Sequence, residues 1–352
     1  MSIQAIKIKA QREAAVTETK APTLRDEFIL VKTAAVALNP TDWKHIDYVA
    51  PIGSTVGCDW AGTVLQVGSK VTRSFKVGDR VWGFAHGSNG VNPDDGTFAT
   101  TITVKGDIAL PIPNNLSFED AATLGVGVYT VGQGLYQSLG LELPSANPTA
   151  HNTPILVYGG STATGALAIQ FAKASGYTVF ATASPRNFDY LTRLGADKVF
   201  DYNSPTVAAD IRAASNGGVA LAFDCVSEAQ SPRICAESFR PEGGKYSALL
   251  TIDAKLLTDI NANIKVSSTL AYTATGEPVV KPAWGLNLPA NLVDFEFAKK
   301  FGLIANELLA SGKVKVHTPS VNEGGSGLDG VLKGLQLLRE GKVSGKKLVY
   351  TL

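Results

Sequence analysis

The residues best suited to binding chemistry lie in a small-residue turn between a predicted strand and a predicted helix. An apolar run, Ile155–Tyr158, leads into the sequence Gly-Gly-Ser-Thr-Ala-Thr-Gly at 159–165, and Ala166–Ala174 has the pattern of an amphipathic helix. Such a junction presents free backbone N–H groups and the positive end of a helix dipole at one point, where a phosphate can bind. The residues that we expect to hold this phosphate are Ser161, Thr162, Ala163 and Thr164.

The next predicted strand, Thr178–Ala183, ends in Ser184-Pro185-Arg186-Asn187 instead of an acidic residue. A carboxylate at this position would accept hydrogen bonds from a ribose 2′-hydroxyl, whereas Ser and Arg suit a 2′-phosphate. An arginine at a helix start is often only solvated, but its position after the second strand of a nucleotide fold favours phosphate binding. The predicted cofactor is therefore NADPH, contacted by Ser184, Pro185, Arg186 and Asn187.

Composition sets broad limits on the class of protein. A chain of 352 residues is long enough to form two domains, and its 45% apolar content is ordinary for a protein with a globular core. The formal net charge of +1 argues against a broad surface for nucleic acid or anionic membrane. The sequence has no long apolar run of membrane-spanning length and no apolar secretion signal at its start. Three widely spaced cysteines, Cys58, Cys225 and Cys235, predict reduced thiols in a cytoplasmic protein.

The pattern along the chain predicts an α/β protein in which a parallel sheet is inserted into a second domain. Strand-like runs alternate with helical segments from about Ile155 to the last predicted strand, Lys265–Tyr272, and glycines at 176, 195 and 217 follow helices. The earlier part has strands broken by glycine-rich turns, with little helical pattern before Phe118. Helices are predicted at 292–311 and 330–340 and a final strand at 347–352. We therefore expect a doubly wound nucleotide domain at 123–291 between two parts of a β-rich domain, 1–122 and 292–352.

Four segments spread over nearly the whole chain carry a family resemblance. They are Asn39-Pro-Thr-Asp-Trp-Lys44, Val56-Gly-Cys-Asp-Trp-Ala-Gly62, Val77-Gly-Asp-Arg-Val-Trp-Gly83 and Gly341-Lys-Val-Ser-Gly-Lys-Lys-Leu-Val349. With the turn and the 184–187 segment, they resemble medium-chain dehydrogenases/reductases of the zinc-independent quinone and enoyl reductase branch. Within that branch the chain resembles the fungal trans-acting enoyl reductases that partner iterative polyketide synthases. The resemblance implies a Rossmann domain inserted into a GroES-like catalytic domain.

The resemblance also implies further contacts to the cofactor. The family's glycine-rich turn has a middle glycine where this chain has Thr162, whose hydroxyl and backbone N–H we expect to donate to the phosphate. Tyr202, at the end of the third predicted strand, is expected beside the same 2′-phosphate as Arg186. The remaining expected cofactor residues are Asn39, Pro40, Thr41, Asp42, Leu249, Leu250, Val343 and Ser344.

Three residues are candidates for the catalytic step. Lys44 could donate a proton or anchor a ribose or carboxamide group, and the alternative is a solvated surface lysine. Thr130 resembles the residue that touches the nicotinamide ribose, although its hydroxyl could equally cap its own helix. Tyr48 is a second candidate donor. A proton taken from solvent is a further alternative, in which case no single side chain is essential.

Two segments are expected to flank the substrate. Small residues in them would leave room for a long acyl chain. The first supplies Leu124, Gly125, Val126, Gly127, Val128, Tyr129 and Val131. The second supplies Leu270, Ala271, Tyr272, Thr273 and Ala274.

Neither zinc site of the superfamily is expected here. The positions that resemble the catalytic zinc ligands are Asn39, Cys58 and Val126, whereas a catalytic zinc needs three protein ligands. The structural zinc needs four closely spaced cysteines, and the first domain has only Cys58, which we expect to be a buried structural cysteine. The four histidines are scattered singly: His45, His86, His151 and His317.

These observations predict an NADPH-dependent reductase of α,β-unsaturated thioesters or related enones. Without a metal to polarise a carbonyl, hydride addition to an activated C=C bond is the easier reaction, because the charge spreads onto an enolate oxygen. The expected substrate is a small or carrier-bound acyl group, and the resemblance implies a polyketide synthase partner and a monomer rather than a dimer. No nucleic-acid or membrane partner is expected. The alternatives are a free-standing quinone or enone reductase and a non-catalytic NADPH-binding protein.

Overall fold

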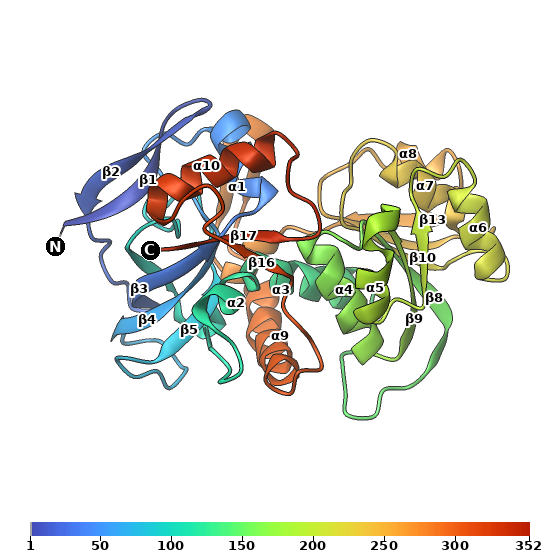
Figure 1. The fold of residues 1–352 in the computed structure, drawn as a ribbon, viewed down its shortest axis with the longest axis horizontal. Helices are drawn as coiled ribbons and strands as arrows, with labels where there is room; N and C mark the ends of the chain where they lie inside the picture. The colour runs from blue at the N-terminus through green and yellow to red at the C-terminus, as the bar shows by residue number, and fades with distance from the viewer. Residues whose placement is uncertain (1) are drawn as a thin grey trace. The chain divides into compact units, whose positions relative to one another are not determined.

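The computed structural model describes residues 2–352, apart from the side chains of residues 152 and 153. Contacts between Cα atoms divide the chain into two compact units (Figure 1). The first unit comprises the chain up to Tyr129 together with Tyr272–Ala310 and Val316–Leu352, and the second comprises Thr130–Ala271 and Ser311–Lys315. These contacts group residues 123–129 and 272–291 with the first unit, whereas the sequence analysis assigned them to the nucleotide domain.

The second unit is built on a six-stranded parallel sheet with the strand order β10-β9-β8-β11-β12-β13. The strands are β8 (His151–Tyr158), β9 (Tyr177–Ala183), β10 (Lys198–Asp201), β11 (Leu221–Asp224), β12 (Gly244–Ala248) and β13 (Ile264–Ser268). Because β8 pairs with both β9 and β11, the winding reverses there, as it does in a doubly wound fold. The predicted Rossmann sheet is therefore confirmed.

Helices pack on both faces of this sheet. They are α4 (Ala163–Ala174), α5 (Phe188–Arg193), α6 (Val207–Ala214), α7 (Ser231–Ser238) and α8 (Lys255–Thr258). Buried residues of α6, α7 and α8 share one core with Phe180 of β9. The neighbouring side chain, Ala181, points to the opposite face, where α4 and α5 approach it beside Gly160. This two-sided cover accounts for the apolar character of the strands.

Three of these helices end as the sequence predicted. Gly176, Gly195 and Gly217 follow α4, α5 and α6, and their φ angles are +85°, +105° and +118°. Glycine adopts this left-handed region without a steric penalty from a Cβ atom. The predicted glycine C-caps are therefore confirmed.

The first unit contains a seven-stranded sheet drawn from both ends of the chain. Its order is β16-β17-β3-β4-β5-β7, and β6 also pairs with β3. The strands are β3 (Phe28–Ala37), β4 (Asp59–Val67), β5 (Arg80–Phe84), β6 (Thr101–Lys105), β7 (Leu110–Pro111), β16 (Pro319–Val321) and β17 (Lys347–Thr351). The C-terminal β17 runs antiparallel to β3, with Val349 opposite Ala37. The β-rich domain therefore does use both chain ends, as predicted.

Two hairpins of the first unit were not predicted from the sequence. One joins β1 (Ser2–Ala10) to β2 (Glu13–Lys20), and the other joins β14 (Val279–Lys281) to β15 (Leu286–Leu288). β2 reads Glu-Ala-Ala-Val-Thr-Glu-Thr-Lys, in which no large apolar residue marks a buried face. Such strands form through pairing with a neighbour, which sequence alternation does not reveal.

Helical structure in the first unit begins at Pro40, earlier in the chain than the sequence indicated. The helices are α1 (Pro40–Lys44), α2 (Phe118–Ala122), α3 (Gly125–Val131), whose last two residues belong to the second unit, α9 (Leu292–Ala310) and α10 (Gly327–Arg339). α1 continues into a π-helical turn, His45–Val49, and α3 into another, Gly132–Ser138. The predicted strand ending at Tyr272 is wrong beyond Ser268, because Ala271–Thr275 forms a 3₁₀ turn. The Thr275 hydroxyl closes that turn by donating to the Tyr272 carbonyl over 2.8 Å.

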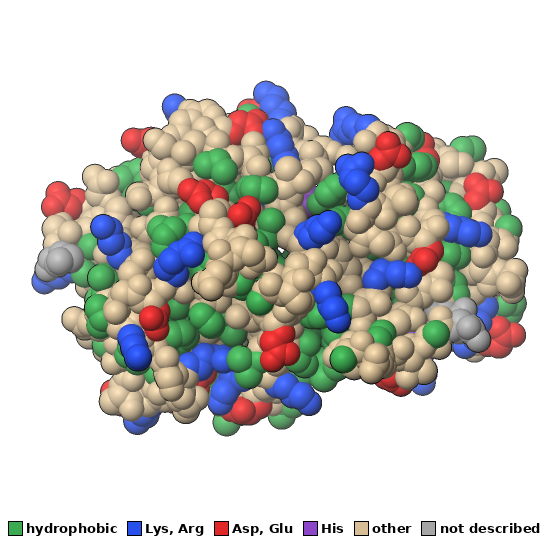
Figure 2. Space-filling view, turned by 60° about the horizontal axis from the view of Figure 1, so that its bottom comes forward, with side chains coloured by type: hydrophobic (Ala, Val, Ile, Leu, Met, Phe, Trp, Pro, Cys, Tyr) green, Lys and Arg blue, Asp and Glu red, His purple; other side chains and the backbone are tan. Residues whose placement is uncertain are grey.

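Charges of both signs are mixed on the surface. The chain has 32 Lys and Arg against 31 Asp and Glu, and Figure 2 shows the two kinds interspersed over the face that it draws. Such mixing leaves no broad field of one sign on that face to attract a polyanion. Within residues 2–352, no helix has both the length and the apolarity that a bilayer crossing requires.

Candidate functional site

The predicted phosphate turn of the second unit connects β8 to α4. Thr162 is the N-cap of α4, and its Oγ1 accepts a hydrogen bond from the Gly165 backbone N–H over 3.0 Å. The same hydroxyl donates to the Gly159 carbonyl over 2.8 Å, and the Thr162 backbone N–H donates to that carbonyl as well, over 3.0 Å. Both Thr162 donors are therefore engaged inside the turn. The expectation that they face a phosphate is corrected: Thr162 shapes the turn and caps the helix.

The donors that remain for a phosphate lie at the start of α4. The first N–H groups of a helix have no partner within the helix, and here they belong to Ala163 and Thr164. A Cβ atom on Gly165 would lie 2.3 Å from the Gly159 carbonyl oxygen, so glycine alone lets the helix start this close to the turn. This arrangement suits an anion at the helix N-terminus. The turn therefore fits a dinucleotide phosphate even though the middle glycine is replaced.

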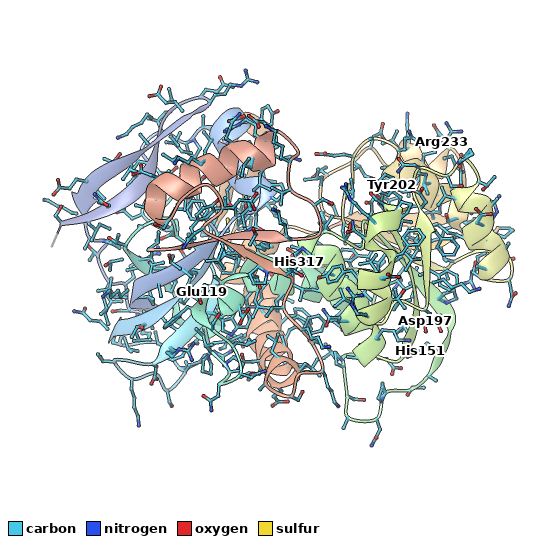
Figure 3. The ribbon with its side chains drawn as sticks, viewed as in Figure 1. Glu119, His151, Asp197, Tyr202, Arg233 and His317 are labelled. Atoms are coloured by element: carbon cyan, nitrogen blue, oxygen red, sulfur yellow. The ribbon has the colours of Figure 1, made fainter. Side chains whose placement is uncertain are left out.

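The residues predicted to recognise a 2′-phosphate gather at the ends of β9 and β10. The Ser184 hydroxyl lies 3.1 Å from the Tyr202 hydroxyl, although 18 residues separate them in the chain. Tyr202, labelled in Figure 3, is 37% exposed, and Arg186 is exposed in the 3₁₀ turn Pro185–Asn187. Two hydroxyls and a guanidinium at this edge of a doubly wound sheet are suitable donors to a phosphate. Leu249 and Leu250 lie just beyond the end of β12 at the same edge of the sheet.

A buried carboxylate that the sequence analysis missed holds the neighbouring turn. Asp224, at the end of β11, accepts hydrogen bonds from the Ser231 hydroxyl at 2.6 Å and the Tyr246 hydroxyl at 2.8 Å. It also accepts from the backbone N–H groups of Val226 and Ser227. The Ser227 hydroxyl in turn accepts from the Leu249 N–H over 2.8 Å. This network fixes the backbone beyond β11 and β12.

In the first unit, the segments that carried the family resemblance meet around Asp59. Its carboxylate accepts hydrogen bonds from the Asn39 amide at 2.8 Å, from the Val126 backbone N–H, and from the Lys347 ammonium at 2.6 Å. Lys347 also donates to the Asn39 side-chain oxygen over 2.9 Å. Asp59 and Lys347 are 0% and 2% exposed in their side chains, so this is a fully buried ion pair.

Asn39 and Asp42 hold the start of α1 through a capping box. Asp42 accepts a hydrogen bond from the Asn39 backbone N–H over 2.7 Å. Burial raises the pKa of Asp42 to about 7, and the nearby Asp59 carboxylate adds to that shift. The predicted cofactor segment 39–42 is therefore anchored by buried polar groups, with Pro40 exposed and Thr41 half-buried.

The candidate catalytic residues differ in how far they are exposed. Lys44 ends α1 and is half-buried, and Tyr48, one helical turn later, is 51% exposed. Thr130 lies inside α3 and is 8% exposed. In the same helix, Tyr129 is buried and donates to the Ile108 carbonyl over 2.6 Å. Lys44 and Tyr48 belong to the first unit, and Thr130 belongs to the second.

Tyr272, a predicted substrate residue, lies in a buried polar cluster of the first unit. Its hydroxyl is 2.7 Å from the Thr41 hydroxyl, which is 3.3 Å from His45 Nδ1. The other ring nitrogen of His45, Nε2, contacts the ammonium of Lys281. The ring of His86 stacks on Tyr272 with a centroid distance of 4.2 Å. Two histidines that look solitary in the sequence therefore meet at one tyrosine.

A small cavity lies next to this cluster. It has a volume of about 10 Å³ and is lined by His86, Asn89, Asp95, Lys105 and Glu277, among others. Such a volume holds about one water molecule and no acyl chain. Burial lowers the pKa of His86 well below its ordinary value and raises that of Asp95 to about 7. This cavity is therefore part of the packing behind the cluster rather than a substrate pocket.

Comparisons with known proteins place this geometry in a family. The alcohol dehydrogenase GroES-like domain matches residues 25–114, and the zinc-binding dehydrogenase domain matches residues 163–248. The trans-enoyl reductase ACTTS2 of Alternaria alternata is 50% identical over 349 residues, which cover 99% of this chain and 98% of that protein. The trans-enoyl reductase TOXD of Cochliobolus carbonum is 55% identical over 266 residues, which cover 76% of this chain and 88% of that protein.

The chain belongs to the trans-enoyl reductase family. The predicted membership of the medium-chain dehydrogenase/reductase superfamily is thereby confirmed, and with it an oxidoreductase that uses a nicotinamide cofactor. Solved structures share the fold: the quinone oxidoreductase from Coxiella burnetii has a TM-score of 0.74 at 24% identity, with both chains fully covered. The CurK enoyl reductase has a TM-score of 0.75 at 17% identity, with 99% of each chain covered.

In this trans-enoyl reductase the positions that resemble zinc ligands are part of the protein's own polar network. Asn39 and Val126 are both bonded to Asp59, and Cys58 is buried with its sulfur 3.9 Å from the Tyr272 hydroxyl. Burial raises the pKa of the Cys58 thiol well above its ordinary value. Among residues 2–352, no three His, Cys, Asp or Glu side chains are disposed to hold a metal ion. Cys58 is buried, as expected.

The remaining predicted residues of the family member fall in three places. Val343 and Ser344 lie in the loop between α10 and β17, four and three residues before the buried Lys347. Leu124–Val131 comprises α3 and the residue before it, and is largely buried. The segment 270–274 is centred on Tyr272 and overlaps the 3₁₀ turn Ala271–Thr275. Sequence reasoning missed His45, His86 and Lys281, which carry no motif of their own and are adjacent only in the folded chain.

Proposed function

We propose that this protein catalyses the NADPH-dependent reduction of the C=C bond of α,β-unsaturated thioesters. The observation that carries the proposal is the Ser184–Tyr202 hydroxyl pair beside Arg186, with no acidic residue at the end of β9. Two hydroxyls and an arginine favour the phosphorylated cofactor over NADH, because a carboxylate there would instead bind the ribose hydroxyl. The family membership supports reduction of an enoyl group, since the matched relatives are named trans-enoyl reductases.

When bound, NADPH would supply the hydride that adds to the β-carbon of the substrate. The protein must then orient the two partners, stabilise the developing enolate oxygen and deliver a proton to the α-carbon. The N–H groups at the start of α4 would hold the pyrophosphate, and Arg186 with its two hydroxyl neighbours would hold the 2′-phosphate. On the first unit, the anchored 39–42 segment, Val343 and Ser344 are proposed to complete the cofactor site.

Lys44, Tyr48 and Thr130 are proposed to act near the nicotinamide end of the cofactor. Lys44 and Tyr48 present an ammonium and a phenol on one side of a continuous helix, where each can donate a hydrogen bond to an oxygen. Thr130 is proposed to contact the nicotinamide ribose through its hydroxyl. The largely apolar segments 124–131 and 270–274 are proposed to contact the acyl chain.

The substrate is proposed to be a carrier-bound acyl chain made by a polyketide synthase. The support is that the matched relatives are named trans-enoyl reductases, and that the family resemblance of the sequence implies a separate synthase as the carrier of the substrate. We also propose that the protein is a cytoplasmic monomer, and its three free, buried cysteines are compatible with a reducing compartment. Light scattering on the purified protein tests the monomer.

The test is turnover of NADPH with a panel of enoyl thioesters of increasing chain length. The proposal expects loss of reduced-nicotinamide absorbance and formation of the saturated thioester, with a preference for longer chains. A set of small quinones serves as the comparison. Rapid turnover of quinones with none of the thioesters would contradict the proposal and indicate a quinone reductase. Binding of NADPH with no turnover of either class would indicate a non-catalytic protein.

A further inference from the structure

Four side chains of the first unit form an unbroken chain of polar contacts. The Lys281 ammonium contacts His45 Nε2, His45 Nδ1 lies 3.3 Å from the Thr41 hydroxyl, and that hydroxyl lies 2.7 Å from the Tyr272 hydroxyl. His45 and Lys281 are each 1% exposed, and Tyr272 is 6% exposed. Lys281 and His45 are 236 residues apart in sequence. The chain thus connects a buried cation to the phenol of a proposed substrate segment.

The chemistry of these groups gives the chain a direction. An ammonium can only donate, so His45 Nε2 must accept from Lys281 and must carry no proton. Burial lowers the pKa of His45 well below its ordinary value, so the imidazole is neutral and its one proton is on Nδ1. The Thr41 backbone also accepts from this ring, which favours the same tautomer. The Nδ1–H is therefore shared between the carbonyl and the hydroxyl of Thr41, and the Thr41 hydroxyl is left to donate to Tyr272.

This direction leaves the Tyr272 proton available. A phenol that accepts from Thr41 keeps its own O–H for another acceptor. Cys58 Sγ lies 3.9 Å from the phenol oxygen, and sulfur is a weak acceptor. Burial raises the pKa of Tyr272 well above its ordinary value, so the phenol stays protonated throughout the working pH range. With a neutral amine at Lys281, the direction of hydrogen-bond donation along these four side chains could reverse, and Tyr272 would then donate to Thr41 instead.

We propose that Tyr272 donates the proton to the substrate α-carbon and that Lys281, acting through His45 and Thr41, keeps that proton available. The proposal rests on the proposed enoyl reduction. Hydride addition at the β-carbon leaves an enolate, and its α-carbon forms a C–H bond as the Tyr272 O–H bond breaks. The phenolate regains a proton from Thr41, Thr41 from His45 Nδ1, and His45 Nε2 from Lys281. To reset the relay, His45 Nε2 returns its proton to Lys281 and a solvent proton is taken up at Nδ1, so each turnover consumes one solvent proton.

The surroundings of Lys281 are suited to a cation that changes its charge. Its ammonium lies 4.1 Å from the ring centroid of Tyr272 and 5.4 Å from that of Trp284. The titratable groups that face it are His45 from the π-helical turn, His86 from the loop after β5, Cys58 and Tyr272. Burial lowers the pKa of Lys281 from 10.5 to about 7. Lys281 is therefore mainly an ammonium below pH 7 and mainly a neutral amine above it.

The first experiment determines where deuterium enters the product in D₂O. The wild-type protein with NADPH and an enoyl thioester is expected to give one configuration at the deuterated α-carbon, because the donor lies on one face. Tyr272→Phe keeps the ring that stacks on His86 but loses the hydroxyl. We expect it to lower kcat by about 10²-fold and to give a mixture of configurations, because solvent then supplies the proton.

The second experiment compares pH profiles. Wild-type kcat is expected to fall as pH rises through about 7, since the hydrogen bonds that lead from Lys281 to Tyr272 reverse their direction when Lys281 loses its proton. Lys281→Met is expected to lower kcat by about tenfold and to remove that fall. The control is Lys105→Met, which changes another buried lysine against aromatic rings, at 5.2 Å from Phe28 and 5.1 Å from Phe295, and which also breaks its ion pairs with Glu27 and Glu277. The control is expected to keep the wild-type profile.

The outcomes separate this proposal from the proposed function. If the wild-type protein reduces no enoyl thioester, the proposed function fails. If it does reduce them and Tyr272→Phe still gives a single configuration at wild-type rate, the proton-donor assignment is overturned while the function stands. A pH profile of Lys281→Met identical to that of the wild type overturns the role of Lys281. Should Lys281→Met fail to fold, the configuration obtained with Tyr272→Phe decides the proposal alone.

Discussion

The groups proposed to bind the 2′-phosphate in the second unit and the polar cluster of the first unit lie in opposite environments. In the second unit, Tyr202 is 37% exposed and Arg186 lies at the surface, so both meet a ligand from water. In the first unit, Lys281 is 1% exposed and the Asp59–Lys347 pair is almost wholly inaccessible. The exposed groups can bind and release a charged cofactor at little cost in desolvation. The buried groups have already lost their hydration, so their interactions depend on the exact set of partners around them.

This difference in exposure suggests two roles: the exposed groups bind the cofactor, and the buried groups hold other side chains in position. A change at the exposed edge of the second unit should alter affinity and leave folding nearly intact. A change in the buried cluster of the first unit should alter stability, protonation or both, because a lone polar group there has no water to replace its partner. Substitutions in the two regions should therefore have measurably different effects.

The largest expected effect comes from breaking the buried ion pair. Lys347→Met leaves the Asp59 carboxylate buried without its cation, which should lower the free energy of unfolding by about 3–5 kcal/mol. The matched control is Lys173→Met, which breaks the Lys173–Asp197 pair of the second unit, where the side chains are 36% and 38% exposed. That pair should contribute less than about 1 kcal/mol. Urea denaturation of both variants makes the comparison, and equal losses would contradict it.

The next effect concerns the cofactor phosphate. Arg186→Ala should weaken NADPH binding by about 10- to 100-fold, because a charge-assisted hydrogen bond contributes about 1.5–3 kcal/mol. NADH binding should hardly change, and the free energy of unfolding should stay within about 0.5 kcal/mol of the wild type. Arg193→Ala, at an exposed position near the end of α5, is the matched control. Titration calorimetry with both cofactors measures the effect, and equal losses for NADPH and NADH would refute the 2′-phosphate assignment.

The smallest effect concerns the hydroxyl pair. Tyr202→Phe removes the partner of the Ser184 hydroxyl and should weaken NADPH binding by up to about tenfold, with NADH unaffected. Ser184→Ala should act similarly. If the two hydroxyls hold one phosphate together, the double variant should lose less affinity than the sum of the two single losses. Strict additivity would show that they act separately.

The same contrast explains which parts of the molecule could be predicted from the sequence. The strands and turn of the second unit follow from contiguous signals, such as the apolar run 155–158 and the glycines after each helix. The pairing of Ser184 with Tyr202 follows from strand order in a doubly wound sheet, because neighbouring parallel strands end at one edge.

The buried groups of the first unit leave no such local signal. Lys347 and Asp59 are 288 residues apart, and no periodicity in either segment indicates that they meet. His45 directly follows Lys44, the last residue of the segment 39–44 that carried the resemblance, and has no motif of its own, while Lys281 lies in a short hairpin that was not predicted. Thr162 is the converse case, in which a local signal was present but misleading. Its residue type suited a phosphate donor, but in the folded turn its hydroxyl and its backbone N–H both donate to the Gly159 carbonyl.

The most direct test of the central claim follows the hydride itself. NADPH carrying deuterium at C4 of the nicotinamide is incubated with the protein and an enoyl thioester, and the product is analysed by mass spectrometry and NMR. The account predicts a saturated thioester with one deuterium at the β-carbon when the label is on the transferred face. A saturated product without β-deuterium from either labelled face, or oxidation of NADPH with the thioester left unchanged, would contradict it.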